Sequence, residues 1–193
     1  MRFKDAIIIS YPLGGKGTQS NFLKDFYEKC LQDYLYIATG NYFRGLSNNN
    51  HSAVLLHESV NIKGELAPDF MATGLVVDNL VQNLDEGKTL IFDGFPRNKK
   101  QGEAFVEIME FYQRKPVIIL IKVSKEEIMK RLPVRKGEES RQDDTEEAVD
   151  NRLKIFDQEN NPLLEYLKEH FECYEIDGND EPEVIHQRIV EVL

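Results

Sequence analysis

The sequence predicts an α/β fold in which a five-stranded parallel sheet carries helices on both faces. Short apolar runs rich in β-branched residues alternate along the chain with longer helical segments. One run, Val117-Ile-Ile-Leu-Ile121, is apolar along its whole length, which is typical of a strand buried on both faces. A glycine-rich segment follows another apolar run near the start of the chain. In a sheet of this kind, ligands bind at the carboxyl ends of the strands.

The expected elements follow from this alternation. Strands are expected at residues 5–10, 34–38, 89–93, 117–123 and 173–176, and helices at residues 17–31, 69–84, 99–112, 125–131, 145–169 and 181–192. Ser124 followed by Glu127 is a capping box before one helix, and Pro162 predicts a break that divides the 145–169 segment into two helices. Residues 41–68 and 133–144 fall outside the alternation. Loops of that length are usually functional lids or disordered.

Composition limits the class of protein. The chain has 193 residues, of which 41% are hydrophobic, enough for one domain with a sizeable core. A net charge of −10 argues against a general nucleic-acid binder. No apolar run approaches a membrane span, and no signal peptide is visible before the first strand. Cys30 and Cys173, in no metal-ligand spacing, predict ordinary buried thiols in a reducing compartment, so we expect the cytoplasm.

The segment Ser10-Tyr-Pro-Leu-Gly-Gly-Lys-Gly-Thr18 follows the first strand and opens a helix. Unpaired N–H groups and the helix dipole favour a phosphate at such a place. Glycines let the backbone approach the phosphate oxygens, Lys16 adds a mobile cation, and the Thr18 hydroxyl is placed for Mg²⁺. Ser10 departs from the usual pattern, which begins with glycine. The alternative is a glycine-rich turn around a surface lysine.

Arginines recur after the predicted strands and around the 133–144 segment, at positions 44, 97, 131, 135, 141 and 152. Phosphoryl transfer needs positioning and positive charge more than covalent help, and guanidinium groups supply both. A single arginine more often makes a surface ion pair, but the whole set favours phosphate. Asp93 ends an apolar strand, where an acid that holds Mg²⁺ through water belongs. The alternative for Asp93 is a turn residue before Gly94.

Several blocks together resemble the adenylate kinase family. They are Gly14-Gly-Lys-Gly-Thr-Gln19, Thr39-Gly40 with Arg44, Lys63-Gly-Glu-Leu66, Asp93-Gly-Phe-Pro-Arg97 with Gln101, Arg131 with Arg135, and Arg141-Gln-Asp-Asp144 with Arg152. The resemblance covers the chain from Ala6 to Val192. It implies a three-layer P-loop NTPase fold over residues 1–193, with a nucleoside-monophosphate-binding lobe at about 39–68 and a short, zinc-free lid at about 133–144. It also implies a monomer.

The resemblance implies a role for each matching residue. ATP would be bound by Gly14, Gly15, Lys16, Gly17, Thr18, Arg131 and Arg135. AMP would be bound by Thr39, Arg44, Gly64, Leu66, Gly94, Arg97, Gln101, Arg141 and Arg152. The catalytic set would be Lys16, Arg97, Arg135, Arg141 and Arg152, with Mg²⁺ held by Thr18 and Asp93, partly through water. Asp143 and Asp144 would order the lid arginines. The implied reaction is reversible transfer of a phosphoryl group from MgATP to AMP, giving two ADP.

Base choice and loop chemistry leave alternatives open. The related pyrimidine-monophosphate kinases carry Asn where this chain has Gln101, and a Gln amide suits the N1 and N6 edge of adenine. The residue therefore favours AMP over UMP or CMP without excluding a UMP/CMP kinase. Ser10 and Leu13 stand where the family generally has Gly, and Asn41 where it usually has Asp. Gly14, next to Leu13, could absorb the strain if the loop shifts. These departures also allow a nucleotide-binding relative with weakened catalysis, acting as a regulatory or interaction protein.

Overall fold

The computed structural model describes residues 3–45, 51–62, 65–138 and 146–193. Within those ranges, the side chains of residues 44, 61–62, 134–138 and 146–148 are outside the description. The strands are β1 (Ala6–Ser10), β2 (Tyr34–Ala38), β3 (Thr89–Asp93), β4 (Val117–Lys122) and β5 (Cys173–Asp177). They form one parallel sheet in the order β2-β3-β1-β4-β5, which confirms the predicted fold class.

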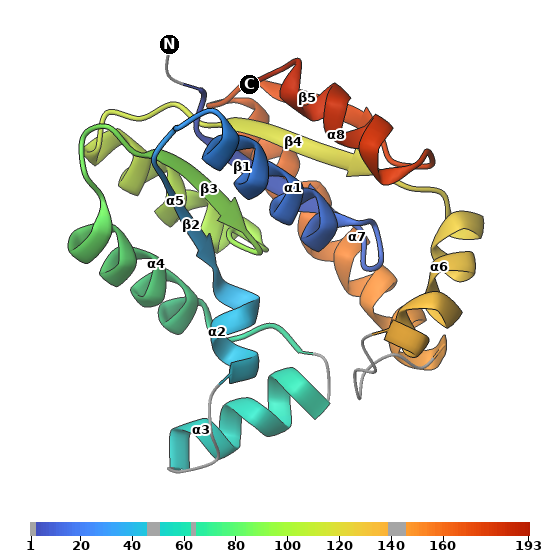
Figure 1. The fold of residues 1–193 in the computed structure, drawn as a ribbon. Helices are drawn as coiled ribbons and strands as arrows, with labels where there is room; N and C mark the ends of the chain where they lie inside the picture. The colour runs from blue at the N-terminus through green and yellow to red at the C-terminus, as the bar shows by residue number, and fades with distance from the viewer. Residues whose placement is uncertain (1–2, 46–50, 63–64, 139–145) are drawn as a thin grey trace.

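The sheet has an apolar core on each face because its central strands are buried at every position except Lys122, the last residue of β4. In β1, Ile7 and Ile9 belong to one core cluster, whereas Ala6 and Ile8 belong to the other, as the two-residue period of a strand requires. The first cluster is completed mainly by residues of α4, α5 and the later part of α7, and the second by residues of α1, α6, α8 and the start of α7. Figure 1 shows α1 and α8 on one face of the sheet and α5 and α7 on the other.

The helices are α1 (Lys16–Lys29), α2 (Thr39–Gly45), α3 (His51–Leu56), η1 (His57–Ile62), α4 (Asp69–Asn83), α5 (Lys99–Phe111), α6 (Lys125–Glu138), α7 (Glu146–Lys168) and α8 (Pro182–Val190). The predicted helices are all present, and apart from α6 their ends agree within two residues. The capping box is half formed, since Ser124 Oγ accepts a hydrogen bond from the Glu127 N–H at 3.2 Å. The Glu127 carboxylate binds Arg131 instead.

Two expected helix boundaries are wrong. The helix expected to end at Arg131 continues as α6 through Pro133, and α7 runs through Pro162 without dividing. A proline inside a helix costs about 3 kcal/mol. In α7, Leu163 and Leu167 are buried in the first core cluster just beyond the proline, and their packing offsets that cost.

The segment 41–68 is also different from the loop that was expected. Its described residues include most of α2, the short helix α3 and the π-helical turn η1. Ala53 and Leu56, three residues apart, are buried, and Leu56 and Phe43 join the first core cluster. These apolar contacts hold the segment as helices, which Figure 1 shows beyond the end of β2. The lobe and lid boundaries stay predictions, and residues 46–50, 63–64 and 139–145 lie outside the described chain.

The expectation that both cysteines are buried thiols is wrong. Both are free thiols, but Cys30 is exposed at the end of α1 and only Cys173 is partly buried. Burial raises the pKa of the Cys173 thiol above its ordinary value. Among the described residues, no helix is both long enough and apolar enough to cross a bilayer.

Candidate active site

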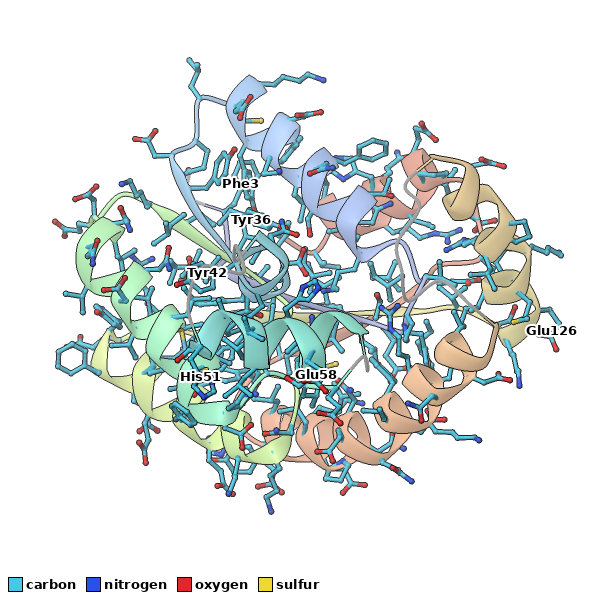
Figure 2. All side chains as sticks on the ribbon, turned by 90° about the horizontal axis from the view of Figure 1, so that it is seen from below. Phe3, Tyr36, Tyr42, His51, Glu58 and Glu126 are labelled. Carbon is cyan, nitrogen blue, oxygen red and sulfur yellow. The ribbon has the colours of Figure 1, made fainter. Side chains whose placement is uncertain are left out.

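The carboxyl ends of the parallel strands meet at one edge of the sheet, and most described residues of the predicted site lie there. β1 leads into the phosphate loop and α1, β2 into Thr39, and β3 into Asp93 and Gly94. Gly178 follows β5 at the same edge. Figure 2 views the side chains from below, with Tyr36 near the middle and with His51 and Glu58 on α3 and η1.

One glycine of the phosphate loop is required by close packing, and another by its backbone conformation. A Cβ on Gly14 would lie 2.8 Å from the Tyr11 carbonyl oxygen, so only glycine fits. Gly15 has φ 83° immediately before α1, and α1 has no acidic residue in its first turn. Gly17 and Thr18 are exposed in that turn. This is a helix N-terminus suited to an anion.

Leu13 takes a left-handed conformation of its own. Its φ is 62°, while its side chain is only 8% exposed and packs into the second core cluster. The strain therefore resides at Leu13 itself, and Gly14 does not absorb it. Burial of a leucine side chain contributes about 1.5–3 kcal/mol, which offsets a left-handed penalty of about 1–2 kcal/mol.

Asp93 is the most heavily bonded group of the site. It is 8% exposed, and its carboxylate forms an ion pair with the Lys16 ammonium. Tyr36 Oη donates to Asp93 Oδ2 at 2.6 Å, and Ser20 Oγ donates to the same oxygen at 3.2 Å. Burial opposes ionisation, but the Lys16 charge and these hydrogen bonds outweigh it and lower the pKa of Asp93. Asp93 is thus held as a carboxylate beside the phosphate loop.

Tyr36 and Ser20 were not predicted as site residues, although their positions in the sequence are consistent with contacts to Asp93. Ala38 pairs with Asp93 in the register of β2 and β3, and Tyr36 lies two residues before it, on the same face. Ser20 lies four residues after Lys16 and therefore on the same side of α1. Neither signal is informative until strand order and register are known.

Gly94 contacts two other residues that were predicted to bind AMP. Thr39 Oγ1 donates to the Gly94 carbonyl at 2.7 Å, and Arg97 Nε donates to it at 2.9 Å. Gly94 has φ 81°, and a Cβ there would lie 2.8 Å from Arg97 Nη2. The Phe95–Pro96 peptide bond between them is cis. The structure thus brings together three of the predicted AMP-binding residues.

Gln101 is buried behind this loop, with 2% of its surface exposed. Its Oε1 accepts from the Arg97 backbone N–H at 2.9 Å, and its Nε2 donates to Asp69 Oδ1 at 3.0 Å. Asn98 caps α5, because its side-chain oxygen accepts from the Gln101 N–H at 2.9 Å. Gln101 is therefore fixed at the start of α5.

Arg131 connects α6 to the phosphate loop and to the turn after β5. Its Nη2 donates to the Gly178 carbonyl at 2.7 Å, and its Nη1 lies 3.5 Å from the Leu13 carbonyl oxygen. Glu127, one helical turn earlier, accepts from Arg131 Nε at 3.0 Å. The guanidinium group is thus held against the predicted ATP site.

A second connection joins the loop to α7. Tyr11 Oη donates to Asp157 Oδ1 at 2.9 Å, and the Tyr11 ring lies 4.2 Å from that of Phe156, centroid to centroid. Burial and the Asp157 hydrogen bond raise the pKa of Tyr11. Arg152 lies earlier on α7, half-buried, and Figure 1 shows that end of the helix beside α6. Tyr11 was not predicted as a site residue from the sequence.

The remaining predicted residues are placed only in part. Leu66 is half-buried just before α4. Gly64, Arg141, Asp143 and Asp144 lie outside the described residues, as do the side chains of Arg44 and Arg135. The contacts of these residues with nucleotides therefore stay predictions.

The donor atoms near Asp93 suit magnesium. The described residues hold no group of three or more His, Cys, Asp or Glu side chains that could enclose a metal ion. Mg²⁺ is usually bound by one or two carboxylates together with waters and substrate phosphates. The Asp93 carboxylate and the exposed Thr18 hydroxyl are oxygen ligands of that kind.

This parallel sheet, with a phosphate loop on α1 and a buried carboxylate paired with its lysine, defines a phosphotransferase of the nucleoside monophosphate kinase class. The model of the adenylate kinase family matches residues 8–172. The chain belongs to the adenylate kinase family.

Individual relatives match over nearly the whole chain. An adenylate kinase of Prochlorococcus marinus (strain NATL1A) is 33% identical over 192 residues, covering 98% of each chain. One of Leptospira biflexa is 31% identical, covering 98% of this chain and 100% of the relative. One of Cyanothece is 33% identical, covering 90% and 86%. These relatives do not favour the pyrimidine kinase or the regulatory protein that the sequence had left open.

Proposed function

We propose that this chain transfers the γ-phosphoryl group of ATP reversibly to AMP, giving two ADP. One observation supports this most strongly. Asp93 forms an ion pair with Lys16, which we assign to the ATP phosphates. The next residue, Gly94, accepts hydrogen bonds from Thr39 and Arg97, which we assign to AMP. Consecutive Cα atoms lie about 3.8 Å apart, so the two phosphate sites adjoin at the end of one strand. Two nucleotides laid end to end would meet there.

On the donor side, the first-turn N–H groups of α1 and the Lys16 ammonium bind the phosphates of ATP. Arg131, held between Leu13 and Gly178, lies beside that loop and covers the adenine. Asp93 and Thr18 would hold Mg²⁺, Asp93 through water. When bound, the ion supplies positive charge to the phosphate oxygens.

On the acceptor side, Arg97 and Arg44 grip the phosphate of AMP, and Gln101 reads the base. The Gln101 amide uses one donor and one acceptor in the two protein contacts named above. An amide has two N–H groups and two oxygen lone pairs, so one of each remains for the N1 and N6 edge of adenine.

Transfer requires positioning rather than a covalent intermediate. A phosphate oxygen of AMP attacks the γ-phosphorus in line, and the bond from that phosphorus to the β–γ bridging oxygen breaks. The bridging oxygen leaves on the first ADP, and the acceptor becomes the second. Arg135, Arg141 and Arg152 neutralise the charge on the transferring group, while closure of the lobe and lid excludes water as a competing acceptor.

The test is to supply MgATP with AMP, GMP, CMP or UMP and to measure the nucleoside diphosphate formed. We expect ADP from AMP and little product from the other three. Product from CMP or UMP would instead support a pyrimidine kinase. ATP binding without product would support the regulatory relative. A monomeric state and cytoplasmic localisation also stay predictions.

Two lysines of α1 give a matched pair for the same assay. Lys16→Ala should lower kcat by orders of magnitude, because it removes the donor-site cation. Lys29→Ala changes an exposed lysine at the other end of the same helix and should leave turnover unchanged. Near-normal turnover in the Lys16 variant would count against the assignment.

A further inference from the structure

Asp69, the first residue of α4, contacts the side chain that we assign to base recognition. We infer that Asp69 fixes the orientation of the Gln101 amide and thereby sets the preference for a 6-aminopurine over a 6-oxopurine acceptor. Asp69 is thus a positioning residue, acting through Gln101. The inference rests on the proposed function, in which Gln101 reads the base of the acceptor.

The Gln101 amide is held by a hydrogen-bond acceptor at its nitrogen and by a hydrogen-bond donor at its oxygen. Nε2 faces Asp69 Oδ1 at 3.0 Å, and Oε1 faces the Arg97 N–H at 2.9 Å. A carboxylate only accepts hydrogen bonds and a backbone N–H only donates them. A half-turn of the amide would place its oxygen against the carboxylate and its NH₂ against the N–H, so both hydrogen bonds would be lost.

The carboxylate is itself held in place by the cap of α5. Asn98 Nδ2 donates to Asp69 Oδ1 at 2.7 Å, while the Asn98 oxygen accepts from the Gln101 N–H. Asp69 therefore ties the start of α4 to the start of α5 through one oxygen. Gln101 is 2% exposed, so few water molecules compete for these bonds.

A fixed amide distinguishes the two kinds of purine. Adenine offers an acceptor at N1 and a donor at N6, whereas hypoxanthine and guanine offer a donor at N1 and an acceptor at O6. One orientation of the Gln101 amide pairs with the acceptor and donor of adenine, and the opposite orientation pairs with the donor and acceptor of a 6-oxopurine. Removing Asp69, one of the two partners that enforce the orientation, should let Gln101 turn more readily and accept a 6-oxopurine.

The experiment compares AMP with IMP, which differs from AMP at the 6-position of the base. Asp69→Leu removes the acceptor, and we expect the ratio of kcat/KM for AMP to that for IMP to fall about tenfold, with the KM for ATP unchanged. Asp69→Asn offers a donor as well as an acceptor and should lower the ratio about threefold. Asp78→Leu, which removes an exposed acid of α4, should leave the ratio unchanged.

Asp69 also lies in the first turn of α4, where an acid stabilises the helix dipole. A purely structural role would lower kcat/KM for AMP and IMP by the same factor, and that result would overturn the inference. An unchanged ratio in the Asn variant would overturn it as well, should the Leu variant fail to fold.

Failure of the proposed function is a separate outcome. If the wild-type protein formed no ADP from AMP, the assigned reaction would be wrong. The ratio of the dissociation constants for AMP and IMP, measured by calorimetry, would still test the Asp69 inference. A ratio that does not differ between the wild type and the Asp69 variants would overturn it.

Discussion

Leu13 lies in the phosphate loop with φ 62° and a side chain that is 8% exposed. We predict that Leu13→Ala lowers the free energy of unfolding by about 2–5 kcal/mol, the range for emptying a buried leucine site. Leu13→Gly should cost about 1 kcal/mol less than Leu13→Ala, because only glycine adopts a positive φ without a penalty. Elsewhere in a chain the usual order is the reverse, since glycine has more freedom to lose on folding.

The assay is urea unfolding of the two variants beside the wild type. A glycine variant less stable than the alanine variant would refute the strain at Leu13.

The activity of the glycine variant gives a second comparison. The Leu13 side chain packs into the core, and its backbone already has the conformation that glycine would adopt. We therefore expect kcat/KM for ATP in the glycine variant to stay within about threefold of the wild type.

Two further predictions concern other groups near α1. Tyr36→Phe removes the 2.6 Å hydrogen bond to Asp93 and should lower kcat for ADP formation about tenfold, the scale for a bond to a charged group. Tyr34→Phe, which removes a bond to exposed Glu28, is the matched control, and equal effects in both would contradict the prediction. Burial and the charge of Lys29 lower the pKa of His186 from 6.5, so the unfolded chain binds a proton that the folded one resists. The free energy of unfolding should therefore decrease as the pH is lowered past about 6.5, and it should decrease less steeply in His186→Phe. Urea unfolding at several pH values measures this, and identical slopes for the two proteins would contradict the prediction.

The sheet could be predicted because its signal is local. Runs such as residues 117–121 are apolar throughout and rich in β-branched residues, which favours a strand with helices on both sides. The strand-end rule then led to Asp93 and Gly94 before any contact was known. Asp93 was predicted to hold Mg²⁺ through water, and that role stays a prediction, whereas its ion pair with Lys16 was not predicted.

The rest depended on contacts distant in sequence. Pro162 predicts a helix break locally, but packing of α7 against the core decides the outcome. The bond from Tyr36 to Asp93 requires the β2–β3 register. Asp69 and Gln101 are 32 residues apart, and no spacing in the sequence indicates that α4 and α5 begin side by side.

The most direct measurement follows the phosphoryl group itself. With ATP labelled at the γ-phosphate and unlabelled AMP, we expect label to enter the β-phosphate of ADP, with one labelled ADP formed for each unlabelled one. Label released as inorganic phosphate, or retained in ATP while AMP is bound, would contradict a site in which two nucleotides meet at residues 93 and 94.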